Sequence, residues 1–197
     1  NNFPVVVKEE KIINGSISMS PAVEFASNYN KWIVNKFEPF IKGNILEIGT
    51  FTGYSAICLS KGLKPDGKLI TIELNDELSD FARSYFHKAG AGEKITQMTG
   101  NALEIIPSLN LMFDLVFIDG DKREYIYYYR AIIDKVKTGG FILADNVLWG
   151  GKVVDKDISD PQARGIIDFN EMILKETNIE HVIIPLRDGL MLIRKKA

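Results

Sequence analysis

The sequence predicts an α/β protein with a seven-stranded, mostly parallel sheet, an antiparallel last strand, and helices on both faces. Two observations predict this fold class. From residue 44 onward, short β-branched apolar runs alternate with amphipathic stretches of helical length, which is typical of a parallel sheet with crossover helices. Near the end of the chain, two apolar runs are joined at Asp188-Gly189, the short-range signal of a hairpin, so one strand must run against the others.

The elements are expected to follow one another along a single domain, residues 1–197, whose catalytic core is 44–197. The segment before the core, residues 1–43, has an apolar helical pattern from Pro21 to Phe37, and we interpret it as a cap or lid. Glycines such as Gly139 and Gly140 are expected just before strands, where the chain needs permissive dihedral angles. Helices fill the gaps between the expected strands, which are 44–49, 68–73, 94–98, 113–119, 139–144, 179–186 and 190–195.

Composition limits the class of function. The chain has 197 residues, of which 46% are apolar and 25% charged, and its net charge is −2. This profile indicates a globular protein that binds small molecules, because it lacks the basic footprint of a nucleic-acid binder. The single cysteine, Cys58, excludes an internal disulfide, and the sequence supports the expectation of neither a membrane-spanning run nor a secretory signal. We therefore expect a cytoplasmic protein without a membrane partner.

Polar residues stand where the predicted strands end, which is where open α/β sheets bind ligands. The first such place is NILEIGTFTGYSA, where Gly49 and Gly53 flank a tight turn that lets a ligand approach the backbone. The spacing G-x-x-x-G differs from the G-x-G-x-x-G fingerprint of a pyrophosphate site. A turn that merely connects a strand to a helix is the alternative.

Glu73 ends the next strand, roughly 20 positions further on, where an acidic residue accepts hydrogen bonds from ribose hydroxyls. Helix capping is the alternative, and it suits Asn75 or Asp76 better than Glu73. A ribose-binding acid combined with a turn that lacks the phosphate fingerprint favours S-adenosylmethionine over a nicotinamide cofactor.

The third cluster consists of Asp119, at the end of FDLVFIDGDK, and Asp145-Asn146, at the end of GGFILADNVLWGG. Two carboxylates and an amide oxygen are hard ligands suited to Mg²⁺, Mn²⁺ or Ca²⁺, and three protein oxygens leave positions open for a substrate. Asp145-Asn146 as an Asx turn and Asp119 as a helix cap are the alternatives. Convergence of two strand ends favours the metal.

Taken together, the motifs resemble a known family. LEIGTFTGYSA, TIEL, FDLVFIDGDKREY, GGFILADNVLWGGKV and LRDGLMLIRK are similar to the cation-dependent class I O-methyltransferases of the caffeoyl-CoA and catechol type, over about residues 19–197. The resemblance implies a Rossmann-like sheet with a reversed last strand. It also implies S-adenosylmethionine as methyl donor, Mg²⁺ as the usual ion, a vicinal aromatic diol as acceptor, and a homodimer.

The resemblance implies roles for individual residues as well. The catalytic lysine falls on Lys122, which is placed to accept the acceptor's proton, and Asn101 stands where bacterial members commonly have an aspartate near the adenine. The metal ligands fall on Asp119, Asp145 and Asn146. The cofactor positions fall on Glu47, Gly49, Tyr54, Ser55, Glu73, Asp119, Asp121 and Met19, and Met19 with Ser20 resembles a segment that closes over the cofactor.

Several interpretations remain open at this stage. Trp149 either flanks an aromatic acceptor or anchors its loop, and Arg187 and Asp188 stand near the expected acceptor mouth. The tyrosines that follow Lys122 are expected to pack against the sheet or a subunit, not against substrate. As a whole, the chain could instead be a noncatalytic nucleoside-binding module, which would not need Lys122, or a nicotinamide-dependent oxidoreductase, which would need the pyrophosphate fingerprint.

Overall fold

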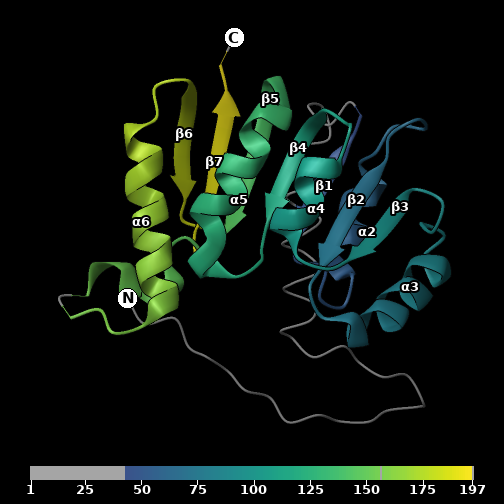
Figure 1. Cartoon of the computed structure of the whole chain (residues 1–197), viewed down its shortest axis with the longest axis horizontal. Helices are drawn as coiled ribbons and strands as arrows, with labels where there is room; N and C mark the ends of the chain where they lie inside the picture. Colours follow the sequence, from purple (N-terminus) through teal and green to yellow (C-terminus); the bar gives the residue numbers. More distant parts are fainter. Residues whose placement is uncertain (1–42, 156, 197) are drawn as a thin grey trace, which may run out of the picture.

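The computed structural model describes residues 43–155 and 157–196 of the chain. Within this part, seven strands form one sheet in the order β3-β2-β1-β4-β5-β7-β6, with helices on both faces (Figure 1). The expected lid helix from Pro21 to Phe37 and the predicted cofactor residue Met19, with Ser20, lie outside the described residues.

All seven predicted strands are present. The strands are β1 (Ile45–Ile48), β2 (Leu69–Glu73), β3 (Ile95–Thr99), β4 (Phe113–Ile118), β5 (Val136–Asp145), β6 (Ile179–Ile184) and β7 (Leu190–Lys195). Only β5 departs clearly from its predicted start at residue 139. Val136 already pairs with Phe113, and a bulge then follows in which Gly139 has a φ of 76°. The expected turn at Gly139 and Gly140 therefore lies inside the strand.

The helices lie in two layers. The helices are α2 (Tyr54–Lys61), α3 (Ser79–Lys88), α4 (Ala102–Ser108), α5 (Tyr125–Ile132) and α6 (Pro161–Lys175), and the short 3-10 turns are η1 (Asp76–Leu78), η2 (Lys122–Glu124), η3 (Ile133–Lys135) and η4 (Trp149–Val154). Figure 1 shows α4, α5 and α6 in front of the sheet and α2 behind it. In the described part of the chain, no helix combines the length and apolar character that crossing a membrane requires.

Strand β4 shows why the sheet is apolar on both faces. Val116 and Ile118 pack with α4, α5 and α6, whereas Leu115 and Phe117 pack with α2 and α3. Successive side chains of a strand point to opposite faces, so a strand covered on both sides needs a continuous apolar run. Burial of both faces leaves the ends of the strands as the place where polar residues can gather.

The strand order positions a ligand site at the carboxyl ends of the parallel strands. Strands β1 to β5 are parallel, and β7 alone runs against both of its neighbours. The chain builds outward from β1 through β2 to β3 and then returns to the other side of β1 with β4. Such a reversal of strand order opens a crevice outside the carboxyl ends of the strands. In Figure 1 these ends lie along the lower edge.

Helix α6 is seated directly on η2, the turn that begins with Lys122. A methyl group added at Gly165 would lie 2.5 Å from the Lys122 carbonyl oxygen and 2.7 Å from the Arg123 Cα. The Lys122 backbone N–H donates to the Gln162 Oε1 at 3.0 Å, one helical turn before Gly165. Glycine is therefore required at this contact. The packing of α6 against η2 positions the backbone of Lys122, the first residue of that turn.

Replacing Gly165 by alanine is expected to lower the melting temperature, because the added methyl group would meet backbone atoms that cannot move aside. Overpacking of this kind costs about 1–3 kcal/mol. Thermal unfolding followed by circular dichroism would measure the change. Glu171→Ala, at an exposed position of the same helix, is the matched control and should change the melting temperature little. Equal melting temperatures for the two variants would contradict the seating of α6 on η2.

Candidate active site

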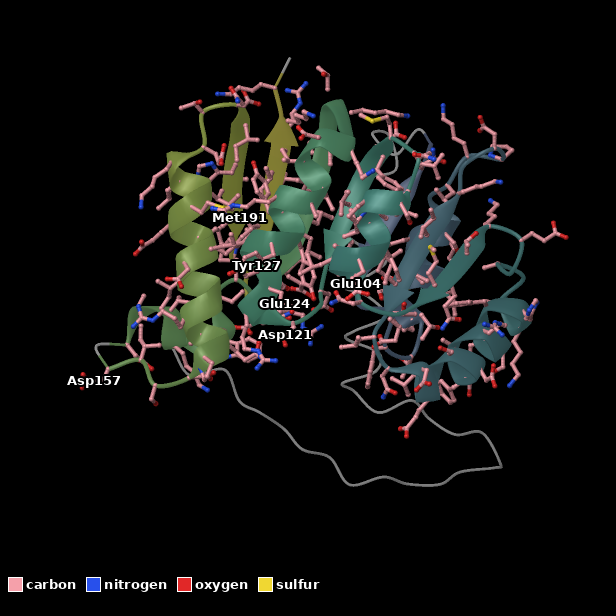
Figure 2. The ribbon with its side chains drawn as sticks, viewed as in Figure 1. Glu104, Asp121, Glu124, Tyr127, Asp157 and Met191 are labelled. Atoms are coloured by element: carbon pink, nitrogen blue, oxygen red, sulfur yellow. The ribbon has the colours of Figure 1, made fainter. Side chains whose placement is uncertain are left out.

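A cavity of about 860 Å³ opens at the carboxyl ends of the parallel strands. Its wall is formed by the turn after β1, by Glu73, by Asn101, by residues 119–121 after β4, and by Asp145 at the end of β5. Gly49, Tyr54 and Ser55, which were predicted to contact a cofactor, lie on this wall, as do Asp119 and Asp121. Figure 2 shows Asp121 at these strand ends, below α5.

The turn after β1 depends on Gly49. This residue has a φ of 101°, and a methyl group added to it would collide with the Asp119 carbonyl oxygen. The Asp119 N–H in turn donates to the Ile48 carbonyl at 2.8 Å, which continues the pairing of β1 with β4 past the ends of the strands. Glycine at this position therefore brings the turn and the first acidic residue together on one wall.

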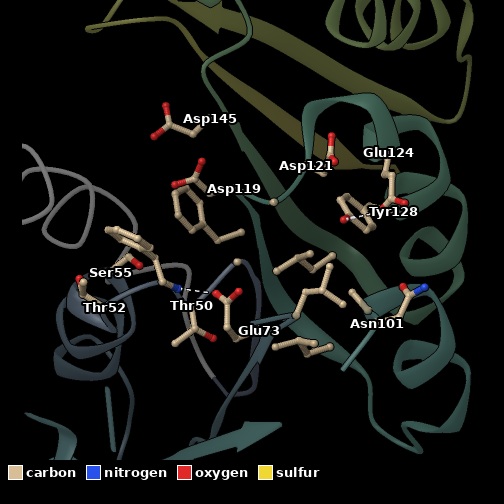
Figure 3. Close-up of a pocket in the computed structure, with 18 of the residues that line it drawn as sticks. Thr50, Thr52, Ser55, Glu73, Asn101, Asp119, Asp121, Glu124, Tyr128 and Asp145 are labelled. Atoms are coloured by element: carbon tan, nitrogen blue, oxygen red, sulfur yellow. Dashed lines mark hydrogen bonds between the residues drawn. The ribbon is translucent and has the colours of Figure 1, made fainter. Parts of the chain in front are cut away.

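Glu73 is held in a fixed orientation on the wall of the cavity. Its Oε2 accepts the Phe51 N–H at 2.7 Å, which is the dashed line to Glu73 in Figure 3, and its Oε1 accepts the Asn75 N–H at 3.0 Å. The capping role belongs to Asn75, whose side chain accepts from the Glu77 N–H at the start of η1. A carboxylate oxygen has more than one acceptor position, so Glu73 can still accept hydrogen bonds from a ligand in the cavity.

Asp119 and Asp145 lie next to each other at one end of the cavity (Figure 3). Burial raises the pKa of Asp145 to about 6, and the nearby negative charge of Asp119 raises it as well. The Asn146 N–H donates to the Asp145 Oδ1 at 2.8 Å. Two carboxylates that repel each other in a partly dry site are an arrangement that a bound cation would relieve.

The third predicted metal ligand is placed differently. Asn146 has a φ of 59° and does not belong to the wall of the cavity. Among the residues described, 43–155 and 157–196, no three Asp, Glu, His or Cys side chains are grouped so that they could hold a metal ion. The structure thus brings together the two carboxylates of the predicted set, while the amide of Asn146 remains a prediction.

Lys122 is buried behind Asp119 rather than on the cavity wall. Its Nζ donates to the Asp119 Oδ1 at 2.7 Å and to the Tyr125 hydroxyl at 2.7 Å. The ion pair with Asp119 fixes the position of this carboxylate. Lys122, the predicted base, therefore contacts Asp119, and Asp119 in turn lines the cavity.

Comparison with known proteins assigns the family. Residues 39–196 match a family model described as O-methyltransferase. The chain belongs to this family. A catechol O-methyltransferase of Niastella koreensis is 33% identical over 168 residues, which cover 83% of this chain and 76% of that protein. The caffeoyl-CoA O-methyltransferase of Petroselinum crispum is 34% identical over 166 residues, which cover 77% of this chain and 68% of that protein.

Solved O-methyltransferases have the same fold. TomG from Streptomyces achromogenes, in complex with SAM, has a TM-score of 0.82 and 32% identity, with 86% of this chain and 80% of TomG covered. An O-methyltransferase from Bacillus cereus, in complex with SAH, has a TM-score of 0.81 and 29% identity, with coverage of 89% and 88%. The predicted fold and the predicted enzyme class, an S-adenosylmethionine-dependent O-methyltransferase, are confirmed. The noncatalytic and oxidoreductase alternatives are set aside.

In this O-methyltransferase, Glu47 lies beneath the cavity and not on its wall. The side chain is completely buried, and its Oε2 accepts the Thr71 hydroxyl at 2.5 Å. Thr71 also shares a 2.5 Å hydrogen bond with the Thr50 hydroxyl, and Thr50 does line the cavity. Burial raises the pKa of Glu47 to about 7, although hydrogen bonds from Ser55 and Thr71 act in the opposite direction.

Tyr128 packs in the buried core as expected of the tyrosines after Lys122, and it also lies on the cavity wall, which was not predicted from the sequence. Its hydroxyl donates to the Glu124 Oε2 at 2.6 Å, one turn earlier (Figure 3). The i,i+4 spacing of Glu124 and Tyr128 was the available signal, because such residues share one face of a helix. Next to them, an ion pair with Arg123 fixes Asp121 and lowers the pKa of its carboxyl.

Asn101 and Trp149 carry structural hydrogen bonds. The Asn101 Oδ1 accepts the Leu103 N–H at 2.9 Å and caps α4 while the residue lines the cavity. The Trp149 Nε1 donates to the Asp160 Oδ2 at 3.0 Å, and Trp149 is not part of the cavity wall. Of the two interpretations of Trp149, the loop anchor is the one that the structure supports.

Replacing Glu47 by glutamine is expected to stabilise the enzyme at about pH 8 and to have little effect near pH 5. Because burial raises the pKa of Glu47, the folded state binds the proton more tightly than the unfolded state, and this stability is lost as the pH rises from 4.5 to about 7. A neutral amide avoids that loss, which is on the order of 3 kcal/mol. Urea unfolding at both pH values would measure it.

The exposed substitution Glu93→Gln is the matched control, and it should change the unfolding free energy little at either pH. If the difference between Glu47→Gln and the wild type were the same at both pH values, the proposed protonation of Glu47 would be refuted.

Proposed function

We propose that this O-methyltransferase transfers a methyl group from S-adenosylmethionine to one hydroxyl of a vicinal aromatic diol, and that a divalent cation is required. The observation that carries the proposal is the adjacent pair Asp119 and Asp145 in the same cavity as Glu73. Two of its relatives are named for catechol and for caffeoyl-CoA, and both names point to an aromatic acceptor.

The donor is proposed to bind along the turn after β1. Glu73 would accept hydrogen bonds from the ribose hydroxyls, because its carboxylate is oriented by two backbone N–H groups and faces the cavity. Asn101 and the ring of Tyr128 line the part of the cavity that we assign to the adenine. Gly49, Tyr54, Ser55 and Asp121 would contact the remainder of the donor, with Glu47 beneath them and Met19 from the N-terminal segment.

The cation is proposed to be Mg²⁺, or Mn²⁺ or Ca²⁺ in its place, held by Asp119 and Asp145 with Asn146 as third ligand. Carboxylate and amide oxygens are the ligands that these ions prefer. The raised pKa of Asp145 supports this assignment, because a neighbouring positive charge would favour the ionised carboxylate. When bound, the ion would favour ionisation of the acceptor hydroxyl, whose pKa is otherwise near 10.

Lys122 is proposed to accept the proton of the acceptor hydroxyl. In the transfer, the bond between the methyl carbon and the sulfonium sulfur would break and a bond between that carbon and the acceptor oxygen would form. The hydroxyl proton would move to the Lys122 Nζ, which must be in its neutral form before it accepts this proton. The positive charge that forms at Nζ lies 2.7 Å from the Asp119 carboxylate, which stabilises it. Much of the rate acceleration would come from holding donor and acceptor in line.

The remaining expectations from the sequence are proposals too. We propose that the protein is a homodimer in the cytoplasm. We also propose that it is a single domain in which residues 1–43 act as a lid.

Replacing Glu73 by alanine is expected to weaken the binding of S-adenosylmethionine by roughly 10- to 100-fold, because hydrogen bonds to a charged acceptor contribute about 1.5–3 kcal/mol. Isothermal titration calorimetry with the full chain would measure the affinity. Glu77→Ala, at an exposed position shortly after Glu73, is the control and should bind the donor normally. An unchanged affinity for Glu73→Ala would remove Glu73 from the donor site.

Replacing Asp145 by asparagine is expected to lower turnover of a catechol roughly 100-fold or more, while donor affinity changes less than about threefold, because the substitution removes one ligand charge from the ion. Product formation can be followed by chromatography. A chelator should have the same effect on the wild type, and added Mg²⁺ should restore its activity. Asp157→Asn, on the loop before α6 and away from the cavity in Figure 2, is the control. Full activity in excess chelator would refute metal dependence.

A further inference from the structure

We propose that Arg187 selects acceptors that carry a negatively charged group, such as a carboxylate, in addition to the aromatic diol. This inference rests on the proposed function and narrows its acceptor class. It concerns Arg187, a residue of the cavity wall to which the proposed function assigns no role.

Arg187 lies in the turn between β6 and β7 and lines the cavity together with Asp145. Among the described residues of the cavity wall, two are cationic, Arg123 and Arg187. The guanidinium of Arg123 is engaged by both carboxylate oxygens of Asp121, beside the part assigned to the adenine. Arg187 is the other cationic side chain of this wall, and its charge acts on Asp145, beside the proposed cation and acceptor.

The backbone of the turn is held firmly against the loop that follows β5. The Leu148 N–H donates to the Asp188 carbonyl at 2.9 Å, and the Gly150 N–H donates to the Asp188 Oδ1 at 2.5 Å. A further bond runs from the Val147 N–H to the Gly189 carbonyl at 3.1 Å. These three hydrogen bonds join the turn between β6 and β7 to the loop after Asp145. The turn that carries Arg187 is therefore pre-organised.

Arg187 also adopts an unfavourable backbone conformation. Its φ is 51°, in the left-handed region that residues other than glycine rarely occupy. Residues in such conformations persist where the surroundings enforce them, and they occur often at ligand-binding sites. A glycine would avoid this strain but would place no charge on the wall. An arginine in this position is therefore consistent with a functional use of its side chain.

The balance of charge explains why the acceptor should be anionic. Asp119 is paired with Lys122, and the positive charge of Arg187 acts on Asp145. Each carboxylate of the acidic pair thus already has a cationic neighbour, and a divalent ion would make this end of the cavity strongly positive. A diol that loses one proton compensates only part of that charge. A carboxylate on the acceptor compensates more, and the planar guanidinium of arginine can bind it with two parallel hydrogen bonds.

The test compares two acceptors that differ in one charge, 3,4-dihydroxybenzoate and its methyl ester, with the full chain, S-adenosylmethionine and Mg²⁺. The wild type is expected to prefer the acid in kcat/KM. Arg187→Gln should lower kcat/KM for the acid roughly 10- to 100-fold and for the ester less than threefold. Calorimetric affinity of the acid for the protein with S-adenosylhomocysteine should fall by a similar factor, which measures recognition independently of turnover.

Two further variants separate charge from shape. Arg187→Lys keeps the charge but loses the forked geometry, so it should recover only part of the preference for the acid. Arg194→Gln, an exposed position of β7 that pairs with Glu180, is the matched control and should keep the wild-type preference.

The outcomes distinguish the inference from the proposed function. If the ester is methylated but Arg187→Gln leaves the ratio of acid to ester unchanged, or lowers both equally, the role of Arg187 in acceptor selection is refuted and the proposed function stands. If neither acceptor is methylated although the donor binds, the proposed function fails and the inference fails with it.

Discussion

The hydroxyl of Tyr125 joins the ends of the two strands that carry the acidic pair. It lies 2.9 Å from the Asp145 carbonyl and 3.1 Å from the Ile118 carbonyl, and it accepts a hydrogen bond from the Lys122 Nζ at 2.7 Å. Tyr125 is completely buried, and its ring packs edge-on against Phe169 with the centroids 5.4 Å apart. Without this hydroxyl, the two carbonyls and the Lys122 ammonium would each lose one hydrogen-bond partner, which is costly in a dry interior. The Tyr125 side chain therefore adds a link between the ends of β4 and β5, which are already paired as neighbouring strands.

The hydrogen bond between Lys122 and Tyr125 also connects this buried tyrosine to the charged groups of the cavity. The Lys122 Nζ donates both to the Tyr125 hydroxyl and to Asp119, and the negative charge of Asp119 raises the pKa of Asp145 in addition to the effect of burial. Ionised groups this close together are unfavourable unless something compensates for them, and such clusters in a cavity are characteristic of functional sites. The acidic pair, rather than the glycine turn alone, therefore distinguishes this cavity from a general nucleoside site. The family match agrees with that interpretation.

Much of the fold could be predicted from the sequence because the signals are local. Alternating apolar runs predicted the strands, and the turn at Asp188-Gly189 predicted the reversed strand β7. The start of β5 was missed because glycine usually interrupts a strand, whereas the pairing of Val136 with Phe113 continues this strand across a bulge. That Tyr128 also lines the cavity was not predicted, because the four tyrosines of α5 look alike in sequence until the helix is oriented on the sheet.

By itself, the sequence determined the order of the strands along the chain and which polar residues stand at their ends, since the period of the apolar pattern and the turn residues depend only on near neighbours. Only the tertiary structure decided how those residues face one another. It buried Glu47 against Thr71, turned Lys122 toward Tyr125, and brought Arg187 to the cavity through the loop after β5. These arrangements depend on contacts between segments far apart in the chain, which pack in one way only when the whole sheet and its helices are assembled.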